Sequence, residues 1–320
     1  MLKKSHSIIL LGFLLALITY YMVGHSSDFK LILNISPAYC FIIGMLYILF
    51  LITNGLFFKI MVSEFDIDMS FCEYTAISIL TAFGNAFVPL RGGVGMRAIY
   101  MKSRYGFNYT NSVATIAGTY VIGLNVTSIV ALVTIVVLYV KEGQSSPAIT
   151  SAIAFMALAS GYIMLFNPQW HKLIPFSGIR SKLDELMYGW SVIRKSSKNV
   201  LYMYALTLSN FILLSVITWC ELKALGIGDM HGNPVTYLQA LFLSVISIIS
   251  LFVSITPASL GIKEGLLMLT SSVVNISPSY VVMMSILDRA ISFSVLLMLF
   301  HPATYCLNVC LRKKAPAEGN

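Results

Sequence analysis

The sequence predicts an all-α polytopic membrane protein, with about six crossing helices and two re-entrant broken-helix hairpins in inverted repeats. The first observation is composition: of 320 residues, 58% are hydrophobic and 11% are charged, whereas a soluble domain has roughly 25% charged residues. The second is that the apolar residues lie in runs close to the ~20 residues that cross a bilayer. The third is that two apolar segments are interrupted by proline and glycine.

The crossing helices are expected in apolar runs that are long enough to span the hydrocarbon core. They cover residues 8–24, 38–58, 112–140, 148–166, 200–222 and 280–299. The first run follows two lysines and resembles a signal peptide, but Tyr20, Tyr21 and Met22 stand where a small-residue cleavage site would lie. We therefore expect an uncleaved first helix.

The two interrupted segments are expected to form re-entrant hairpins. Residues 74–104 are broken at 89–93, and residues 236–275 are broken at 257–261, each time with proline first and glycine last. Proline interrupts helix hydrogen bonding. Non-helical backbone at membrane depth is tolerated where it is buried in protein or lines a water-filled cavity.

The hairpins divide the chain into two similar halves, approximately 1–140 and 148–311. Each half has two crossings, a hairpin and a third crossing, so the second half is inverted relative to the first. Inverted repeats with broken helices are a transporter device. The alternative is that proline and glycine are simply frequent in membrane helices.

The distribution of the 21 Lys and Arg residues supports this topology. The outer side would carry only Lys30, Lys141 and Lys223, and most other cations would lie inside, as the positive-inside rule requires. We expect one transmembrane domain over 1–320, multi-pass in the cell (inner or plasma) membrane. Both termini would be cytoplasmic, with 312–320 as a cytoplasmic tail.

Charged residues at membrane depth cost about 2.5–3.5 kcal/mol on insertion scales and persist where they are paired or face water. They occur in this chain around the two breaks and in the last apolar run. Together with the breaking residues they form the candidate substrate-binding set: Asn85, Pro89, Arg91, Gly92, Gly93, Arg97, Pro257, Gly261, Lys263, Glu264, Asp288 and Arg289.

The breaks favour an anionic ligand. A helix that restarts after a break exposes unpaired backbone N–H groups at its N-terminus. Gly92 and Gly93 let a ligand approach the backbone closely, and the guanidinium of Arg91 can hold a phosphate through two hydrogen bonds. At the second break, Glu264 could pair with an arginine or with an amine on a head group.

Several of these charges also have a structural interpretation. Arg97 could extend to lipid phosphates at the inner surface, and Lys263 could reach the outer interface. Asp288 and Arg289 could form structural ion pairs with charges near the breaks. Glu221 is expected at the outer end of its helix.

The sequence contains no motif typical of an enzyme, a metal-binding protein or a nucleic-acid-binding protein. The chain has no Walker motif, HExxH metal motif or GxSxG elbow, so we expect no enzyme activity, no cofactor and no metal. The net charge of +8 comes without an RNA-binding signature or zinc spacing, so we expect no nucleic-acid partner. The five cysteines form no CxxC pair and are expected to be small apolar residues in helices.

At these residues the chain resembles the lysylphosphatidylglycerol synthase transmembrane (flippase-like) family. The first family motif is roughly N-x-x-x-P-x-R-x-G-E-x-x-R, and residues 85–97 match its Asn, Pro, Gly and both Arg, with Val94 in place of Glu. The second motif is roughly P-x-x-x-G-x-x-E-G and is matched by residues 257–265. Arg289 matches an arginine of the last family helix.

The resemblance implies a domain that translocates lipids, by analogy with members fused to a synthase of aminoacylated phosphatidylglycerol. The family often carries Glu-Arg and Asp where this chain has Thr119, Tyr120 and Gly123, so no ion-pair network is expected there. The implied partners are membrane lipids with an anionic or zwitterionic head group, with a homo-oligomer or a lipid-modifying enzyme as a further association. The alternatives are a transporter of a small polar solute and a non-catalytic membrane subunit of a lipid- or glycan-modifying system.

Overall fold

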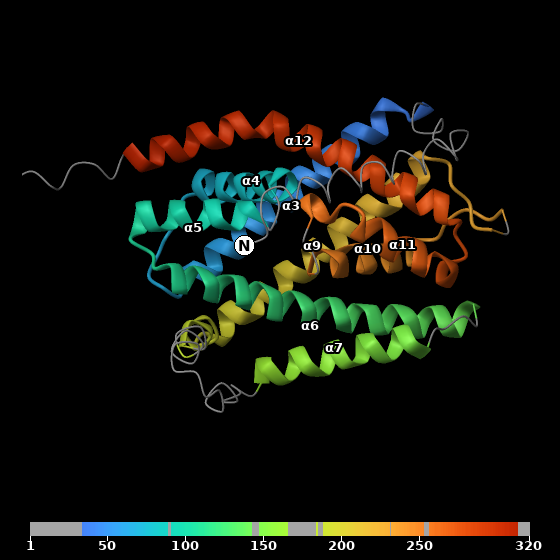
Figure 1. Ribbon diagram of the computed structural model, residues 1–320, viewed down its shortest axis with the longest axis horizontal. Coiled ribbons are helices and arrows are strands. Elements are labelled where there is room, and N and C mark those ends of the chain that lie inside the picture. The colour runs from blue at the N-terminus through green and yellow to red at the C-terminus, as the bar shows by residue number, and fades with distance from the viewer. Residues whose placement is uncertain are drawn as a thin grey trace, which may run out of the picture.

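The computed structural model describes residues 34–88, 91–142, 147–165, 184, 188–230, 232–252 and 256–312. Their regular structure is helical, apart from one isolated β-bridge between Gly228 and Pro234. The long helices run along the longest axis of the molecule (Figure 1). The all-α expectation is therefore confirmed for the described residues.

Four helices are long and apolar enough to cross a membrane. They are α3 (Pro37–Ser63), α6 (Tyr109–Glu142), α9 (Ser197–Ala224) and α12 (Pro278–Arg312). Helix α7 (Pro147–Leu165) packs along α6 and is a shorter apolar helix. The expected crossing at 8–24 lies outside the described residues. The chain is thus a multi-pass membrane protein, and its crossing count stays a prediction.

Prolines set where three of these helices begin. Pro37, Pro147 and Pro278 are the first residues of α3, α7 and α12. The fixed φ of proline suits a first helical position, where the missing N–H has no helical acceptor. All three helices start at the right-hand end of the molecule in Figure 1.

The first interrupted segment forms an antiparallel helical hairpin of α4 (Phe71–Phe87) and α5 (Gly92–Tyr105). At its open end, the Tyr100 hydroxyl donates to Glu73 Oε1 at 2.6 Å. At its tip, Gly84 faces Gly93. Both helices occupy the left half of Figure 1.

The second interrupted segment forms another antiparallel hairpin, with its tip toward the centre. It contains α10 (Tyr237–Phe252), η3 (Pro257–Ser259), α11 (Ile262–Thr270) and η4 (Ser271–Val274). Gln239 Nε2 donates to Val274 O at 2.9 Å near the open end, and Ser259 Oγ donates to Ser250 O at 3.3 Å near the tip. Helices α10 and α11 lie in the right half of Figure 1. The two hairpins open toward opposite ends, and their re-entry into a membrane stays a prediction.

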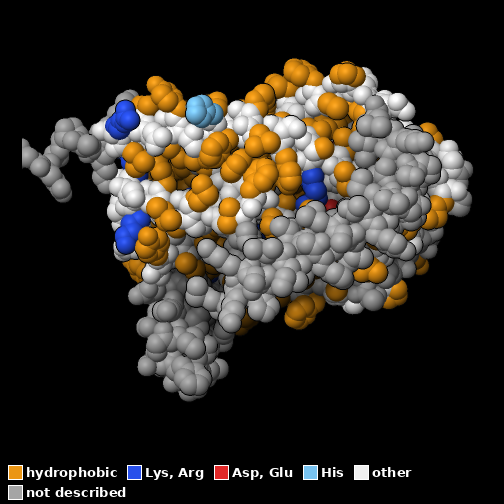
Figure 2. Space-filling view, turned by 45° about the horizontal axis from the view of Figure 1, so that its top comes forward, with side chains coloured by type: hydrophobic (Ala, Val, Ile, Leu, Met, Phe, Trp, Pro, Cys, Tyr) orange, Lys and Arg blue, Asp and Glu red, His pale blue; other side chains and the backbone are white. Residues whose placement is uncertain are grey.

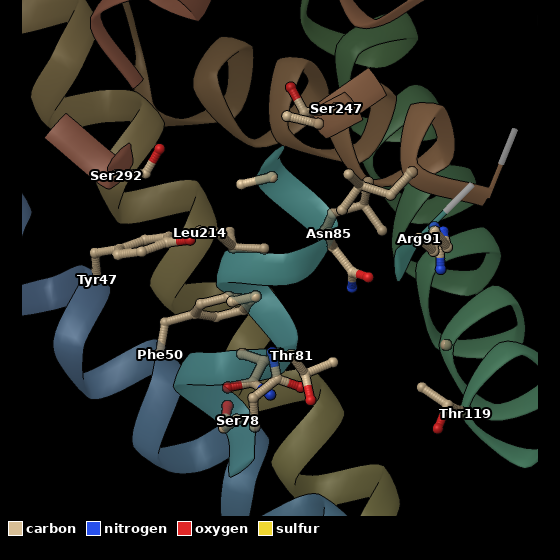
Figure 3. A pocket seen from close by; sticks show the side chains of 18 of the residues that line it. Tyr47, Phe50, Ser78, Thr81, Asn85, Arg91, Thr119, Leu214, Ser247 and Ser292 are labelled. Carbon is tan, nitrogen blue, oxygen red and sulfur yellow. The ribbon is translucent and has the colours of Figure 1, made fainter. Parts of the chain in front are cut away.

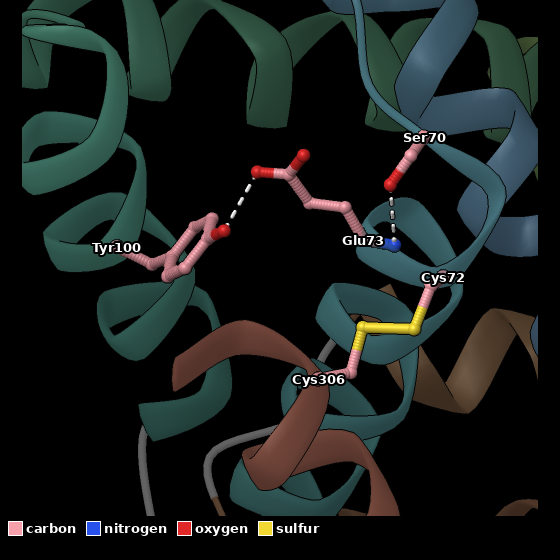
Figure 4. The surroundings of a disulfide bond; sticks show 5 residues. All are labelled: Ser70, Cys72, Glu73, Tyr100 and Cys306. Atoms are coloured by element: carbon pink, nitrogen blue, oxygen red, sulfur yellow. Dashed lines mark hydrogen bonds between the residues drawn. A yellow bond between two sulfur atoms is a disulfide. The ribbon is translucent and has the colours of Figure 1, made fainter. Parts of the chain in front are cut away.

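The cysteine expectation is wrong for one pair. Cys72 in α4 and Cys306 in α12 are joined by a disulfide, with a Cα–Cα distance of 6.5 Å (Figure 4). Spacing along the chain could not indicate this pair, because 234 residues separate the two cysteines and only the packing of α4 against α12 brings them together. Cys40, Cys220 and Cys310 are not joined by a disulfide.

The first hairpin depends on very close packing of its two helices. A Cβ atom on Gly93 would lie 1.9 Å from the carbonyl oxygen of Thr81, and one on Gly84 would lie 2.4 Å from Gly93 Cα. Small residues let membrane helices approach to backbone contact. The glycines at this tip therefore serve the contact between α4 and α5.

We expect Gly93→Ala to lower the free energy of unfolding by about 1–3 kcal/mol, because the added methyl group must push the helices apart. Thermal unfolding of the purified protein in detergent, followed by tryptophan fluorescence, measures the change. Gly95→Ala is the matched control on the same helix, since no atom lies within 4 Å of the added Cβ. Equal melting temperatures for the two variants would show that the helices are not held at backbone contact.

Candidate functional site

A cavity of about 440 Å³ lies in the middle of the molecule, where the tips of the two hairpins meet. Its wall comes from both hairpins and from α3, α6, α9 and α12. Figure 3 looks into this space, with Tyr47 and Phe50 on one side and Arg91 and Thr119 on the other. The cavity is therefore enclosed by most of the helices that the structure describes.

The chain is forced into unusual backbone conformations at both breaks. Arg91, the N-cap of α5, has φ +56°, and Ala258 and Ser259 at the second break have φ +48° and +55°. Non-glycine residues avoid the left-handed region, and such strain persists where surrounding structure imposes it, often at functional sites. Arg91 and Ala258 both line the cavity.

One side of the cavity carries two arginines, Arg91 and Arg97, from the first two turns of α5. The Arg91 guanidinium donates to the Tyr120 hydroxyl and lies 5.0 Å from that ring. The Arg97 guanidinium lies 4.3 Å from the Phe58 ring. Among the described residues, neither arginine forms an ion pair with an acidic side chain.

A hydrogen-bonding group without a partner lies beside these arginines. The side-chain oxygen Oδ1 of Asn85 is buried and has no hydrogen-bond partner in the described part of the chain. Figure 3 shows the Asn85 side chain pointing into the same open space that Arg91 and Thr119 border. Because buried polar atoms are nearly always paired, this oxygen is suited to a ligand group that donates a hydrogen bond.

The opposite side of the cavity carries ion-paired charges. Lys263 Nζ donates to Asp288 Oδ2 at 2.5 Å, and both residues line the cavity. Arg289 Nη2 donates to Glu264 Oε1 at 2.7 Å, and its Nη1 donates to Ala258 O at 2.9 Å. Arg289 therefore fastens α12 both to α11 and to the second break.

Glu264 is held by several donors. Its Oε2 accepts from the backbone N–H of Gly261 at 2.7 Å, and its Oε1 accepts from the Ser285 hydroxyl at 2.7 Å as well as from Arg289. The residue is 7% exposed. Glu264 thus caps the N-terminus of its own helix α11, and of the two partners considered from sequence it takes the arginine.

The structure brings half of the candidate residues to the cavity wall: Asn85, Arg91, Arg97, Lys263, Asp288 and Arg289. Five others lie at the breaks and are not part of that wall: Gly92, Gly93, Pro257, Gly261 and Glu264. Pro89 lies outside the described residues. The interfacial interpretation of Lys263 is wrong, because it is 9% exposed and paired. The binding role of the whole set stays a prediction.

Residue-by-residue reasoning missed two parts of this site. Tyr120 receives the hydrogen bond of Arg91, and only the family motif drew attention to its position. Glu221, expected at an outer helix end, lies in the last turn of α9 and is 1% exposed. No sequence signal indicates this burial, because it depends on the packing of α9 against α3, α10 and α12 in the folded chain.

The expectation that the protein binds no metal stays a prediction. Within the described residues, no three or more His, Cys, Asp and Glu side chains group in a way that could hold a metal ion. The expectation that the protein uses no cofactor stays a prediction.

Comparison with known proteins identifies the region. Residues 7–299 match the family model described as the lysylphosphatidylglycerol synthase TM region. A search of curated proteins and a search of solved structures gave no match. The family resemblance predicted from the motifs is thereby confirmed.

We expect Arg289→Ala to lower the free energy of unfolding by about 3–5 kcal/mol, because it leaves the buried Glu264 carboxylate without its cation. Unfolding in detergent by a chemical denaturant measures the loss. The double variant Arg289→Leu with Glu264→Leu should recover much of it, since both charges are then gone.

The matched control is the exposed pair Lys59–Asp68, at 3.1 Å with the Asp68 side chain 91% exposed. Lys59→Ala should change stability by about 0–1 kcal/mol. A similar loss for Lys59→Ala and Arg289→Ala would contradict the structural importance of the buried pair.

Proposed function

We propose that this chain, which belongs to the lysylphosphatidylglycerol synthase TM family, translocates a phospholipid or glycolipid by moving its head group through the central cavity. The acyl tails remain in the bilayer while the head group crosses. The observation that carries the proposal is the cationic wall of Arg91 and Arg97, which face the cavity without acidic partners among the described residues.

The chemistry of this wall favours a phosphodiester. A buried charge is unfavourable unless an opposite charge compensates it. A head-group phosphate would supply that charge to Arg91 and Arg97, and arginine binds phosphate oxygens in a two-pronged geometry. The head-group hydroxyl or amine donors would satisfy the free Oδ1 of Asn85.

The size of the cavity supports a head group as its occupant. Its volume of about 440 Å³ falls in the range of about 300–1,000 Å³ that holds small-molecule ligands. Such a space admits a polar head group and leaves the long acyl chains outside.

The surface supports access from the side. The face in Figure 2 is rich in apolar side chains, and basic and acidic atoms are visible in a hollow near its middle. Lysine and arginine side chains gather instead at the left end. Charged groups that are accessible from the middle of an apolar face would border the hydrocarbon layer of the membrane. A lipid in that layer could move its head group sideways into the cavity.

The distribution of basic residues supports a membrane orientation for the proposed translocator. Lys102 and Arg104 end α5, and Arg312 ends α12, at the left end of the molecule in Figure 1. The positive-inside rule assigns that end to the cytoplasm of a cell membrane. The hairpin of α4 and α5 then enters from the cytoplasm, and the hairpin of α10 and α11 enters from the outside, so that the two breaks meet near the midplane.

We expect Arg91→Ala to slow lipid translocation by about tenfold or more, because a hydrogen bond to a charged group contributes about 1.5–3 kcal/mol, and 1.4 kcal/mol corresponds to a factor of ten. The measurement is the loss of a fluorescent phosphatidylglycerol from one leaflet of proteoliposomes. Arg312→Ala, at the exposed end of α12, is the control and should leave the rate unchanged.

The same vesicles separate lipid from solute transport. Uptake of water-soluble glycerophosphoglycerol, with no movement of the labelled lipid, would replace the lipid proposal by transport of a small polar solute. Equal lipid rates for wild type, Arg91→Ala and empty vesicles would overturn the proposed function.

A further inference from the structure

Glu221 carries a buried carboxyl group and is not part of the cavity wall. It lies in the last turn of α9, is 1% exposed, and its Oε1 has no hydrogen-bond partner among the described residues. An ionised carboxylate buried without a compensating cation is strongly unfavourable. The state of this group therefore depends on the charges that face it.

The Glu221 carboxyl lies close enough to Asp288 and Lys263 to interact with the charges of both. Asp288 is also the partner of Lys263, at 2.5 Å, and it lines the cavity. Two carboxyls therefore share one ammonium group. Among the described residues, the other titratable and charged groups around this pair are Tyr47 of α3, Cys220 and Lys223 of α9, and the ion pair Glu264–Arg289 of α11 and α12.

None of these surrounding groups supplies a second cation to the pair. Arg289 is committed to Glu264 and to Ala258 O. Lys223 lies at the exposed surface, 3.8 Å from the ring of Trp219. With every one of these described groups ionised, the cluster would hold one carboxylate more than it has cations. One bound proton removes that buried negative charge and supplies a hydrogen bond between the two carboxyls.

We propose that Glu221 and Asp288 form a proton-binding site which couples proton movement to movement of the head group in the cavity. The coupling part of this inference rests on the proposed function. The site has a route to the cavity, because Asp288 lines it and its side chain is 26% exposed. Glu221 itself is not part of the cavity wall.

Lys263 is the physical link between proton and ligand. When the carboxyl pair holds its proton, Lys263 has less negative charge to compensate and can turn toward an anion in the cavity. An anionic head group held by Lys263 in turn favours the protonated pair. Binding of proton and anion is therefore mutually reinforcing, and the linkage is reciprocal. The two would cross together, toward the less acidic side.

Infrared spectroscopy of the wild-type protein in vesicles tests the proton site without any transport. The wild type should show the carbonyl band of a protonated, buried carboxyl at neutral pH. Glu221→Gln and Asp288→Asn should each abolish the band, because the remaining carboxylate then pairs with Lys263 one to one. Glu73→Gln is the matched control, since Glu73 is also a buried carboxyl but has Arg104 and Tyr100 as partners; this variant should keep the band.

A wild-type protein without the band, or a Glu221→Gln variant that keeps it, would overturn the proton site. The two isosteric variants guard against misfolding, because loss of the band in both with unchanged thermal unfolding excludes a general structural defect.

Proteoliposomes with labelled phosphatidylglycerol and an enclosed pH-sensitive dye test the coupling. A pH gradient across wild-type vesicles should drive the anionic lipid into the leaflet on the alkaline side, with proton entry that the dye reports. Glu221→Gln should still equilibrate the lipid between leaflets but lose the gradient-driven asymmetry. If the wild-type protein distributes the lipid in the same way with and without the pH gradient, the coupling is overturned and the proposed function stands. Absence of any lipid movement would overturn the proposed function, while the infrared band still decides whether the proton site exists.

Discussion

The ion pair between Arg289 and Glu264 is the interaction on which the second half of the molecule depends. Glu264 caps α11 through Gly261 N–H and receives Arg289 from α12, and Arg289 reaches on to the carbonyl of Ala258. One buried pair therefore fixes a helix start, a strained break and a neighbouring helix together. Since both partners are nearly buried, loss of either would leave a charge that the interior cannot solvate. The buried pair of Arg289 and Glu264 therefore shapes the cavity wall next to the second hairpin.

The first hairpin is held together at its tip by close helix packing. Its tip carries no ion pair among the described residues, and α4 and α5 meet instead through glycines at backbone contact. Arg91 and Arg97 of this hairpin line the cavity, and neither has an acidic partner in the described part of the chain. The two hairpins thus contribute opposite properties to one space. One offers cations that a ligand can compensate, and the other offers charges that compensate each other.

In the proposed mechanism, this asymmetry would suit the movement of an anion and a proton through the same cavity. The cations of α5 would attract the ligand, while the carboxyl pair of Glu221 and Asp288 would adjust the charge of the opposite wall. Lys263 would link proton binding to ligand binding, because it is ion-paired with Asp288 and also lines the cavity. A head group would then be bound most strongly when a proton is present, and the energy for directed movement would come from the proton gradient rather than from a nucleotide.

The helical membrane class, the two interrupted segments and the charges near them could be predicted from local properties of the chain, namely hydrophobic run length, proline and the scarcity of charge. The order and spacing of the motifs at 85–97 and 257–265 also predicted the family, which the family model over residues 7–299 confirms. The pairing of the charges could not be predicted in this way, because it depends on how the helices pack. Arg289 pairs with Glu264, and Lys263 pairs with Asp288. Glu221 is buried, although the sequence predicted an outer helix end there. Pairing depends on distances between helices far apart in the chain, and hydropathy and spacing carry no information about those distances.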